Sequence, residues 1–86
     1  EFEGLLRFML PPDSPSHDNL QDIFTRYTSS TEMVAMREAI QGEVQEYSYQ
    51  IRLIDPSYKT DLVDSLSKLD DISEVSLVMQ RTTVEI

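Results

Sequence analysis

His17 is the one histidine in the chain, and it stands in a polar segment just before a predicted helix. As a general base it would need an orienting carboxylate, and Asp13 or Asp18 could serve. No serine or cysteine nucleophile motif accompanies it, and the chain contains no cysteine at all. We therefore interpret His17 as a solvent-exposed turn residue, and we predict no catalytic residue and no enzymatic activity.

The acidic residues raise the question of a metal site. Their tightest groups are Asp70-Asp71 and the pair Asp18 and Asp22, and neither follows a calcium-loop spacing with its glycine. Asp18 and Asp22 already have a role in the first turns of a helix, where the dipole favours negative charge. The chain has only two glycines, so a glycine-rich phosphate loop is excluded as well. We predict no metal site and no cofactor.

The charge balance argues against nucleic acid as a ligand. Seven basic residues stand against sixteen acidic ones, which gives a net charge of −9 that repels phosphate backbones. Tyr47 and Tyr49 could stack bases from an open sheet. However, they share their strand face with Ile51 and Leu53, which predicts that they belong to the core.

Six elements must position these residues. Leu6, Phe8 and Leu10 alternate on a first strand over residues 5–10, which Pro11-Pro12 ends. A helix follows, with Ser16 or Asp18 as its cap, and residues 28–31 break its pattern. Strands are predicted over residues 32–40 and 44–54, around a tight turn at Gln41-Gly42, with Met33 and Met36 on opposite faces. Asp55-Pro56 starts a second helix as cap and first residue. A last strand runs from residue 75 through Met79, as far as Ile86.

The order β-α-β-β-α-β predicts the fold class. Two such units with right-handed crossovers form a ferredoxin-like α+β plait, a four-stranded antiparallel sheet with both helices on one face. We expect one domain over residues 1–86. The predicted shared core comprises Leu20, Ile23, Phe24, Tyr27, Tyr49, Ile51, Leu53, Leu62, Leu66 and Leu69, and Met9, Met33, Met36 and Met79 are expected to fill gaps in it.

A partner surface is predicted from the plait. The open sheet face carries little charge, and the strands over residues 32–40 and 75–86 form edges that lack charged residues along part of their length. We expect a protein partner or weak self-association, which salt should strengthen by screening the net negative charge. The alternative for the open face is a merely solvated surface. The candidate partner surface comprises Ser48, Gln50, Arg52, Met33 and Val78.

Two segments resemble the ACT and related small-molecule-sensing plaits. The stretch 69–77 looks like the helix-to-strand passage of those domains, and residues 12–15 resemble their ligand loop, although the glycine usual there is missing. This resemblance implies the same plait, and it offers an alternative function as a sensor that binds an effector at a dimer interface.

A resemblance over nearly the whole chain is to the cytosolic C-terminal domain of an uncharacterised family of bacterial multi-pass membrane proteins. It is carried by Leu5-Leu6-Arg7-Phe8, Ile23-Phe24 with residues 27–30, Gly42 before residues 46–49, and residues 53–56. The resemblance implies a non-enzymatic regulatory or assembly domain on the cytoplasmic side of a bacterial inner membrane. Since the chain begins at Glu1 rather than Met, we expect it to be a fragment of a longer protein, with any membrane contact made through segments outside this chain.

Overall fold

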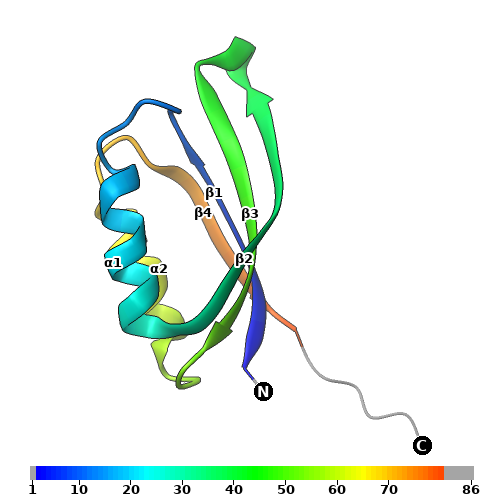
Figure 1. The fold of residues 1–86 in the computed structure, drawn as a ribbon, viewed down its shortest axis with the longest axis vertical. Coiled ribbons are helices and arrows are strands. Elements are labelled where there is room, and N and C mark those ends of the chain that lie inside the picture. The colour runs from blue at the N-terminus through cyan, green and yellow to red at the C-terminus, as the bar shows by residue number, and fades with distance from the viewer. Residues whose placement is uncertain (1, 81–86) are drawn as a thin grey trace, which may run out of the picture.

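A computed structural model of the chain describes residues 2–80. It is a four-stranded antiparallel sheet with two helices on one face (Figure 1). The predicted extension of the last strand toward Ile86 falls on residues 81–86, outside the described residues. The elements are β1 (Glu3–Leu10), α1 (His17–Tyr27), β2 (Thr28–Ala39), the 3-10 turn η1 (Ile40–Gly42), β3 (Val44–Leu53), α2 (Tyr58–Ser67) and β4 (Ser73–Met79).

The strand order is β2-β3-β1-β4, with every neighbouring pair antiparallel. This order confirms the predicted α+β plait and places β2 and β4 at the two edges, as expected. In the register of β1 and β3, Leu6 lies opposite Tyr49 and Phe8 lies opposite Tyr47. Directly opposite residues share a face, so these four side chains all point toward the helices.

The core lies between the sheet and the two helices. The alternation read in the first strand is confirmed, because Leu6, Phe8 and Leu10 are fully buried. Each such side chain contributes about 1.5–3 kcal/mol relative to an exposed position. The predicted shared core is also confirmed: its fully or largely buried members are Leu20, Phe24, Ile51, Leu53, Leu62 and Leu66, with Ile23, Tyr27, Tyr49 and Leu69 packed against them.

The first helix has the predicted Ser16 at its N-cap but without the predicted capping bond, and the second helix starts two residues later than predicted. Ser16 occupies the N-cap position of α1, but its hydroxyl makes no capping bond and instead donates to the carbonyl oxygen of Asp70 at 2.8 Å. The second helix begins at Tyr58 rather than at Pro56. The reason is local, because the Oδ1 of Asp55 accepts from the backbone N–H of Ser57 at 2.9 Å and from its hydroxyl at 2.7 Å. These bonds close a turn ahead of the helix.

The predicted break between the first helix and the second strand is absent. Thr28 follows α1 directly in an extended conformation, with φ −124° and ψ 150°. Its backbone N–H donates to the carbonyl oxygen of Phe24, and its hydroxyl donates to the same oxygen at 2.7 Å, so Thr28 holds the last helical turn through two bonds. The strand therefore starts four residues earlier than the predicted start at Glu32 and is 12 residues long.

Candidate interaction surface

The longest strand of the domain is also its most exposed. Every residue of β2 from Glu32 to Glu38 is exposed, and β2 is an edge strand with no neighbour on its outer side among the described residues. Its apolar side chains are not covered, since Met33, Val34 and Met36 retain 48%, 53% and 53% of their surface. Unpaired backbone groups next to exposed apolar side chains are a template for another strand.

A bulge at Val34 changes which side chains share a face. Met33 lies opposite Tyr49, and the register then shifts so that Ala35 lies opposite Ser48 and Met36 opposite Tyr47. The extra residue therefore places both methionines on the helix-facing side. Two predictions are wrong here: the methionines do not lie on opposite faces, and neither fills a gap in the core.

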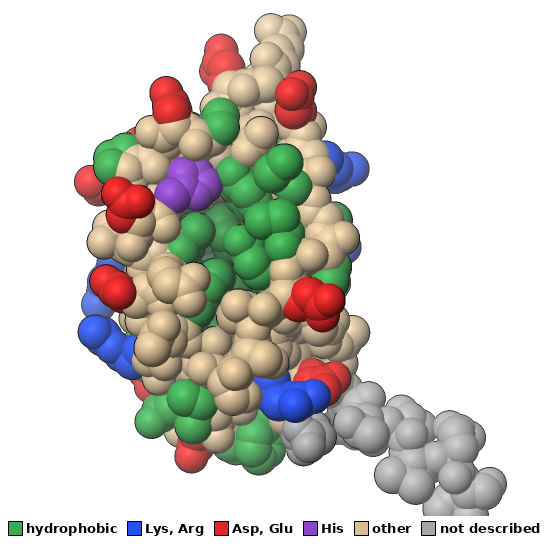
Figure 2. All heavy atoms as spheres, in the orientation of Figure 1, with side chains coloured by type: hydrophobic (Ala, Val, Ile, Leu, Met, Phe, Trp, Pro, Cys, Tyr) green, Lys and Arg blue, Asp and Glu red, His purple; other side chains and the backbone are tan. Residues whose placement is uncertain are grey.

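An apolar hollow opens between α1 and β2. Figure 2 shows green side chains gathered beside the purple histidine, between the helices and the hairpin of β2 and β3. Its floor is aromatic, because the ring of Phe8 stacks on Tyr47 at 5.4 Å and on Tyr49 at 5.9 Å between centroids. Met33 and Met36 continue this floor toward the edge of the sheet. We call Met33, Met36, Tyr47 and Tyr49 the aromatic hollow.

The two tyrosines of the aromatic hollow are held as neutral phenols. Burial raises the pKa of Tyr47 above its ordinary value, and burial followed by the neighbouring Tyr47 raises the pKa of Tyr49. The hydroxyl of Tyr47 donates to the Oε1 of Gln45 at 2.6 Å. The hollow therefore presents ring faces and thioethers without formal charge, which suits apolar contact rather than acid–base chemistry.

His17 is not the solvent-exposed turn residue that the sequence suggested. It is the first residue of α1 and half-buried. Its Nε2 lies 2.9 Å from the carbonyl oxygen of Pro11, and its ring meets Tyr47 edge-on at 5.5 Å between centroids. Neither Asp13 nor Asp18 is its partner. The ring closes one end of the aromatic hollow.

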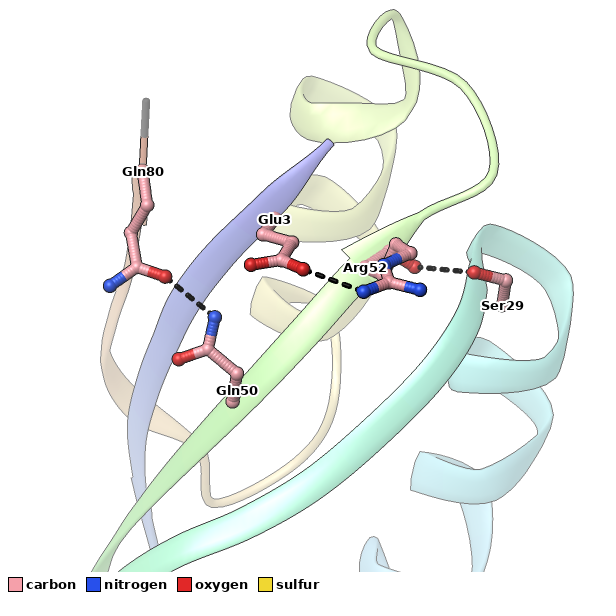
Figure 3. A network of polar contacts seen from close by, with 5 residues as sticks. All are labelled: Glu3, Ser29, Gln50, Arg52 and Gln80. Atoms are coloured by element: carbon pink, nitrogen blue, oxygen red, sulfur yellow. Dashed lines mark hydrogen bonds and ion pairs between the residues drawn. The ribbon is translucent and has the colours of Figure 1, made fainter. Parts of the chain in front are cut away.

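The open sheet face is held by polar contacts between strands (Figure 3). The guanidinium of Arg52 donates to the Oε2 of Glu3 at 2.6 Å, and its backbone carbonyl accepts from Ser29 at 3.4 Å. The amide of Gln50 donates to the Oε1 of Gln80 at 2.6 Å across β1. These contacts join side chains of β1, of β3 and of the residue after β4 into one polar layer on the open face.

The predicted partner surface does not form one patch. Ser48 is only 7% exposed, because it lies between its neighbours on β1 and β2, and it can contribute little contact area. Gln50 and Arg52 lie on the open face within the polar layer. Val78 is 62% exposed on the same face but at the opposite edge, whereas Met33 lies on the helix-facing side of β2.

The loop that resembles an ACT ligand loop is hydrogen-bonded to the loop ahead of β4, which is distant in sequence but adjacent in space. The hydroxyl of Ser14 donates to the Oδ2 of Asp71 at 3.3 Å, and Ser16 contacts Asp70 as described above. Both serines are buried. Asp70 and Asp71 thus join the loops that precede α1 and β4. Within residues 2–80, no group of three or more acidic, histidine or cysteine side chains is placed to hold a metal ion.

A second, more polar hollow lies where α1 passes into β2. Hydroxyl groups dominate its wall, and one aromatic ring contributes to it. It begins at the same edge of the sheet as the aromatic hollow. Its lining residues are Gln21, Phe24, Thr25, Thr28, Ser29, Ser30 and Thr31.

Sequence reasoning missed the charged residues that flank the apolar part of β2. Arg37 donates to Glu46 across the strand pair at 2.7 Å, and Glu32 lies on the same open face, opposite Gln50. Val34 was also missed, although the uncharged run from Met33 to Met36 was a visible signal. Neither helix within residues 2–80 is long and apolar enough to cross a bilayer.

Comparison with solved structures supports the fold assignment. The ACT domain from the GTP pyrophosphokinase of Chlorobium tepidum matches with a TM-score of 0.63 at 13% sequence identity, and the match covers 90% of this chain and 97% of that domain. At this identity the likeness defines the fold, an ACT-like α+β plait. No protein-family model matches the chain, and no curated protein matches it.

Proposed function

We propose that this domain is a non-enzymatic regulatory or assembly module that acts through protein contacts made by β2. The observation that carries the proposal is the unbroken exposure of residues 32–38 on an edge strand, with three large apolar side chains among them. Natural proteins protect such edges with short strands, proline, charge or β-bulges. β2 has a bulge at Val34, but the strand is 12 residues long, contains no proline and carries no charge from Met33 to Met36. A large exposed apolar surface on a small domain marks a contact site.

Photocrosslinking in the natural host tests this function. A photoreactive amino acid at position 33 should capture a protein, identified by mass spectrometry of the crosslinked peptide, whatever that protein is. The matched control is position 64, because Asp64 is exposed on α2, away from β2. Equal or absent crosslinking at the two positions would overturn the proposal.

The membrane context rests on the resemblance carried by residues 5–8, 23–24, 27–30, 42, 46–49 and 53–56. In this proposal the module is appended to a bacterial membrane protein and works on the cytoplasmic side of the inner membrane. The sequence of the natural gene around this segment tests it. Apolar spans in the same reading frame would support the proposal, and a reading frame without any would overturn it.

A second candidate function is an ACT-like sensor that binds a small effector at a dimer interface. The hydroxyl-lined hollow at the junction of α1 and β2 favours it, because Thr25, Ser29 and Ser30 offer several donors and acceptors beside Phe24. The glycine-free loop ahead of α1, fixed by the bonds of Ser14 and Ser16, does not. Calorimetry with amino acids and nucleotides separates the candidates, since only the sensor releases or takes up heat with a saturable stoichiometry.

A further inference from the structure

The exposed part of β2 is complementary to itself. When residues 32–37 are aligned with a second copy that runs in the opposite direction, Glu32 lies opposite Arg37, Met33 opposite Met36, and Val34 opposite Ala35. In an antiparallel pair of two identical strands, this match occurs when the numbers of opposite residues sum to 69. The two-fold axis then passes between Val34 and Ala35, and every contact occurs twice.

The bulge makes this register possible. In a regular strand, residues 33 and 36 point to opposite faces, and pairing them across a two-fold axis would place unlike faces together. Here the extra residue at Val34 puts Met33 and Met36 on the same face, opposite Tyr49 and Tyr47 of β3. These tyrosines are two positions apart on β3. The backbone N–H and C=O groups of Met33 and Met36, which lie opposite them, therefore point to the same edge of β2.

The faces of the charged residues agree as well. Glu32 lies opposite Gln50 and Arg37 opposite Glu46, so both charges are on the open face. In the register in which opposite numbers sum to 69, Glu32 of each copy lies opposite Arg37 of the other copy on the open face. Arg37 is largely exposed, and its contact with Glu46 engages only one nitrogen of a group with five donors.

We propose that two copies of this domain pair through β2 in this register, giving one continuous eight-stranded sheet with all four helices on the same side. The proposal rests on the proposed function and names its partner, a second copy of this chain. In the pair, the methionines of each copy extend the aromatic hollow of the other. The exposed Ile40 of each hairpin comes alongside Ser29 of the other copy, next to the hydroxyl-lined hollow.

The opposite edge offers no equivalent match. The described residues of β4 contain Glu74 and no cation, so two copies of β4 could form no ion pair between them. The bulge of β4 lies at its first residues rather than at its centre. Self-pairing through β4 is therefore disfavoured, and Val78 provides a matched control.

Charge reversal tests the proposed pair. Sedimentation of the wild-type chain at 0.15 M salt should show a monomer–dimer equilibrium, and Glu32→Arg alone should weaken it roughly tenfold because two like-charge contacts replace two ion pairs. Arg37→Glu alone should weaken it similarly. Mixing the two variants should restore association, since the mixed pair again joins arginine to glutamate at both sites.

Cysteine crosslinking tests the register, and the absence of native cysteine removes any background. Opposite residues in a non-hydrogen-bonded or hydrogen-bonded pair lie about 4.5–5.5 Å apart between Cα atoms, within disulfide range. Met33→Cys mixed with Met36→Cys should therefore crosslink rapidly under oxidation. Met33→Cys alone should not, because the two copies of residue 33 are offset by about 10 Å along the strands.

Three outcomes would overturn the proposal. The first is a wild-type chain that stays monomeric at high concentration in both low and high salt. The second is Met33→Cys crosslinking to itself as fast as to Met36→Cys. The third is Glu32→Arg associating as the wild type does, and this variant decides the matter if Arg37→Glu fails to fold beside Glu46. A monomeric chain that still captures another protein from position 33 would leave the proposed function standing.

Discussion

The two edges of the sheet are protected to different degrees. Along β4, exposed and half-buried residues alternate, and Val75, Leu77 and Met79 pack against the core beside α2. Along the middle of β2 no residue is even half-buried. In this domain the two helices leave the far end of the hairpin of β2 and β3 standing away from them (Figure 1). The comparison shows that one edge strand packs partly against the core, whereas the middle of the other is exposed throughout.

Truncating a core side chain of α2, the helix that packs beside β4, should have the largest effect on stability. Leu66 of α2 is fully buried, so Leu66→Ala should lower the free energy of unfolding by about 2–5 kcal/mol through lost transfer energy and a cavity. Urea titration measures it. Ser67→Ala, at an exposed neighbouring position, is the control and should stay within about 0.5 kcal/mol. A loss below half a kcal/mol for Leu66→Ala would show that α2 does not pack there.

The close fit of β4 to its neighbour provides the next test. A Cβ at Gly4 would lie 2.9 Å from the Sδ of Met79 and 3.1 Å from the carbonyl oxygen of Val78. Gly4→Ala should therefore destabilise the domain by about 1–3 kcal/mol through overpacking. Part of this cost should vanish in a Met79→Ala background, and an equal cost in both backgrounds would locate the strain elsewhere.

A lysine placed on β2 and a lysine placed on β4 should affect association differently. Met36→Lys places a charge on β2 at a position that is already exposed, so it should change stability by less than about 0.5 kcal/mol but weaken association about tenfold. Val78→Lys, equally exposed on β4, should leave both unchanged. Sedimentation of the two variants side by side gives the answer, and equal losses would remove the distinction between the edges.

The tip of the exposed hairpin carries strain that a substitution should release. Ile40 has φ +50°, a left-handed conformation that is unfavourable for a β-branched residue, and it is 64% exposed. Ile40→Asn should raise the free energy of unfolding by about 0.5–1 kcal/mol, because asparagine tolerates this region. Glu43→Asn, where φ is −74°, should bring no gain and serves as the control. A destabilising Ile40→Asn would mean that the isoleucine makes a contact that outweighs its strain.

The smallest effect concerns pH. Hydrogen bonds from the Ser57 hydroxyl and backbone N–H lower the pKa of Asp55 below its ordinary value of 3.8. A carboxylate with a lowered folded-state pKa stabilises the domain above its unfolded pKa, and this contribution is lost as pH falls through the folded value. The wild type should therefore melt slightly above Asp55→Ala at pH 7, and the difference should close below pH 3.8. A difference that persists in acid would exclude the carboxylate as its source.

Much of the fold was predictable because its signals are local and periodic. Leu6, Phe8 and Leu10 alternate within one strand, and the stripe Leu20, Phe24 repeats at helical spacing. Such patterns depend on neighbouring residues alone, and the structure confirms them. The plait then follows from the order of the elements.

The candidate interaction surface was less predictable because the faces of its side chains depend on one extra residue in β2. A bulge at Val34 adds a residue to β2 without disturbing the composition that marks a strand, and it reverses the faces of everything beyond it. The role of Ser16 was equally hidden, since its partner Asp70 lies 54 positions away in the chain. Contacts of that range are fixed by the finished fold.

The central position of β1 has a consequence for how this domain is made. Among its strands β1 is synthesised first, yet it pairs with β3 and with β4, the last strand to be completed. β1 therefore cannot pair until partner residues about 40 and 70 positions further along the chain have been synthesised. Pairings so distant in sequence slow folding, and they lengthen the time for which the apolar side chains of β1 are exposed during synthesis. The bonds from the Ser14 and Ser16 hydroxyls to the loop ahead of β4 can form only after β4 has joined the sheet. The backbone N–H of Ser16, which donates to the Oγ of Ser14 in the same loop, should therefore be among the last amides protected in a hydrogen-exchange record of refolding.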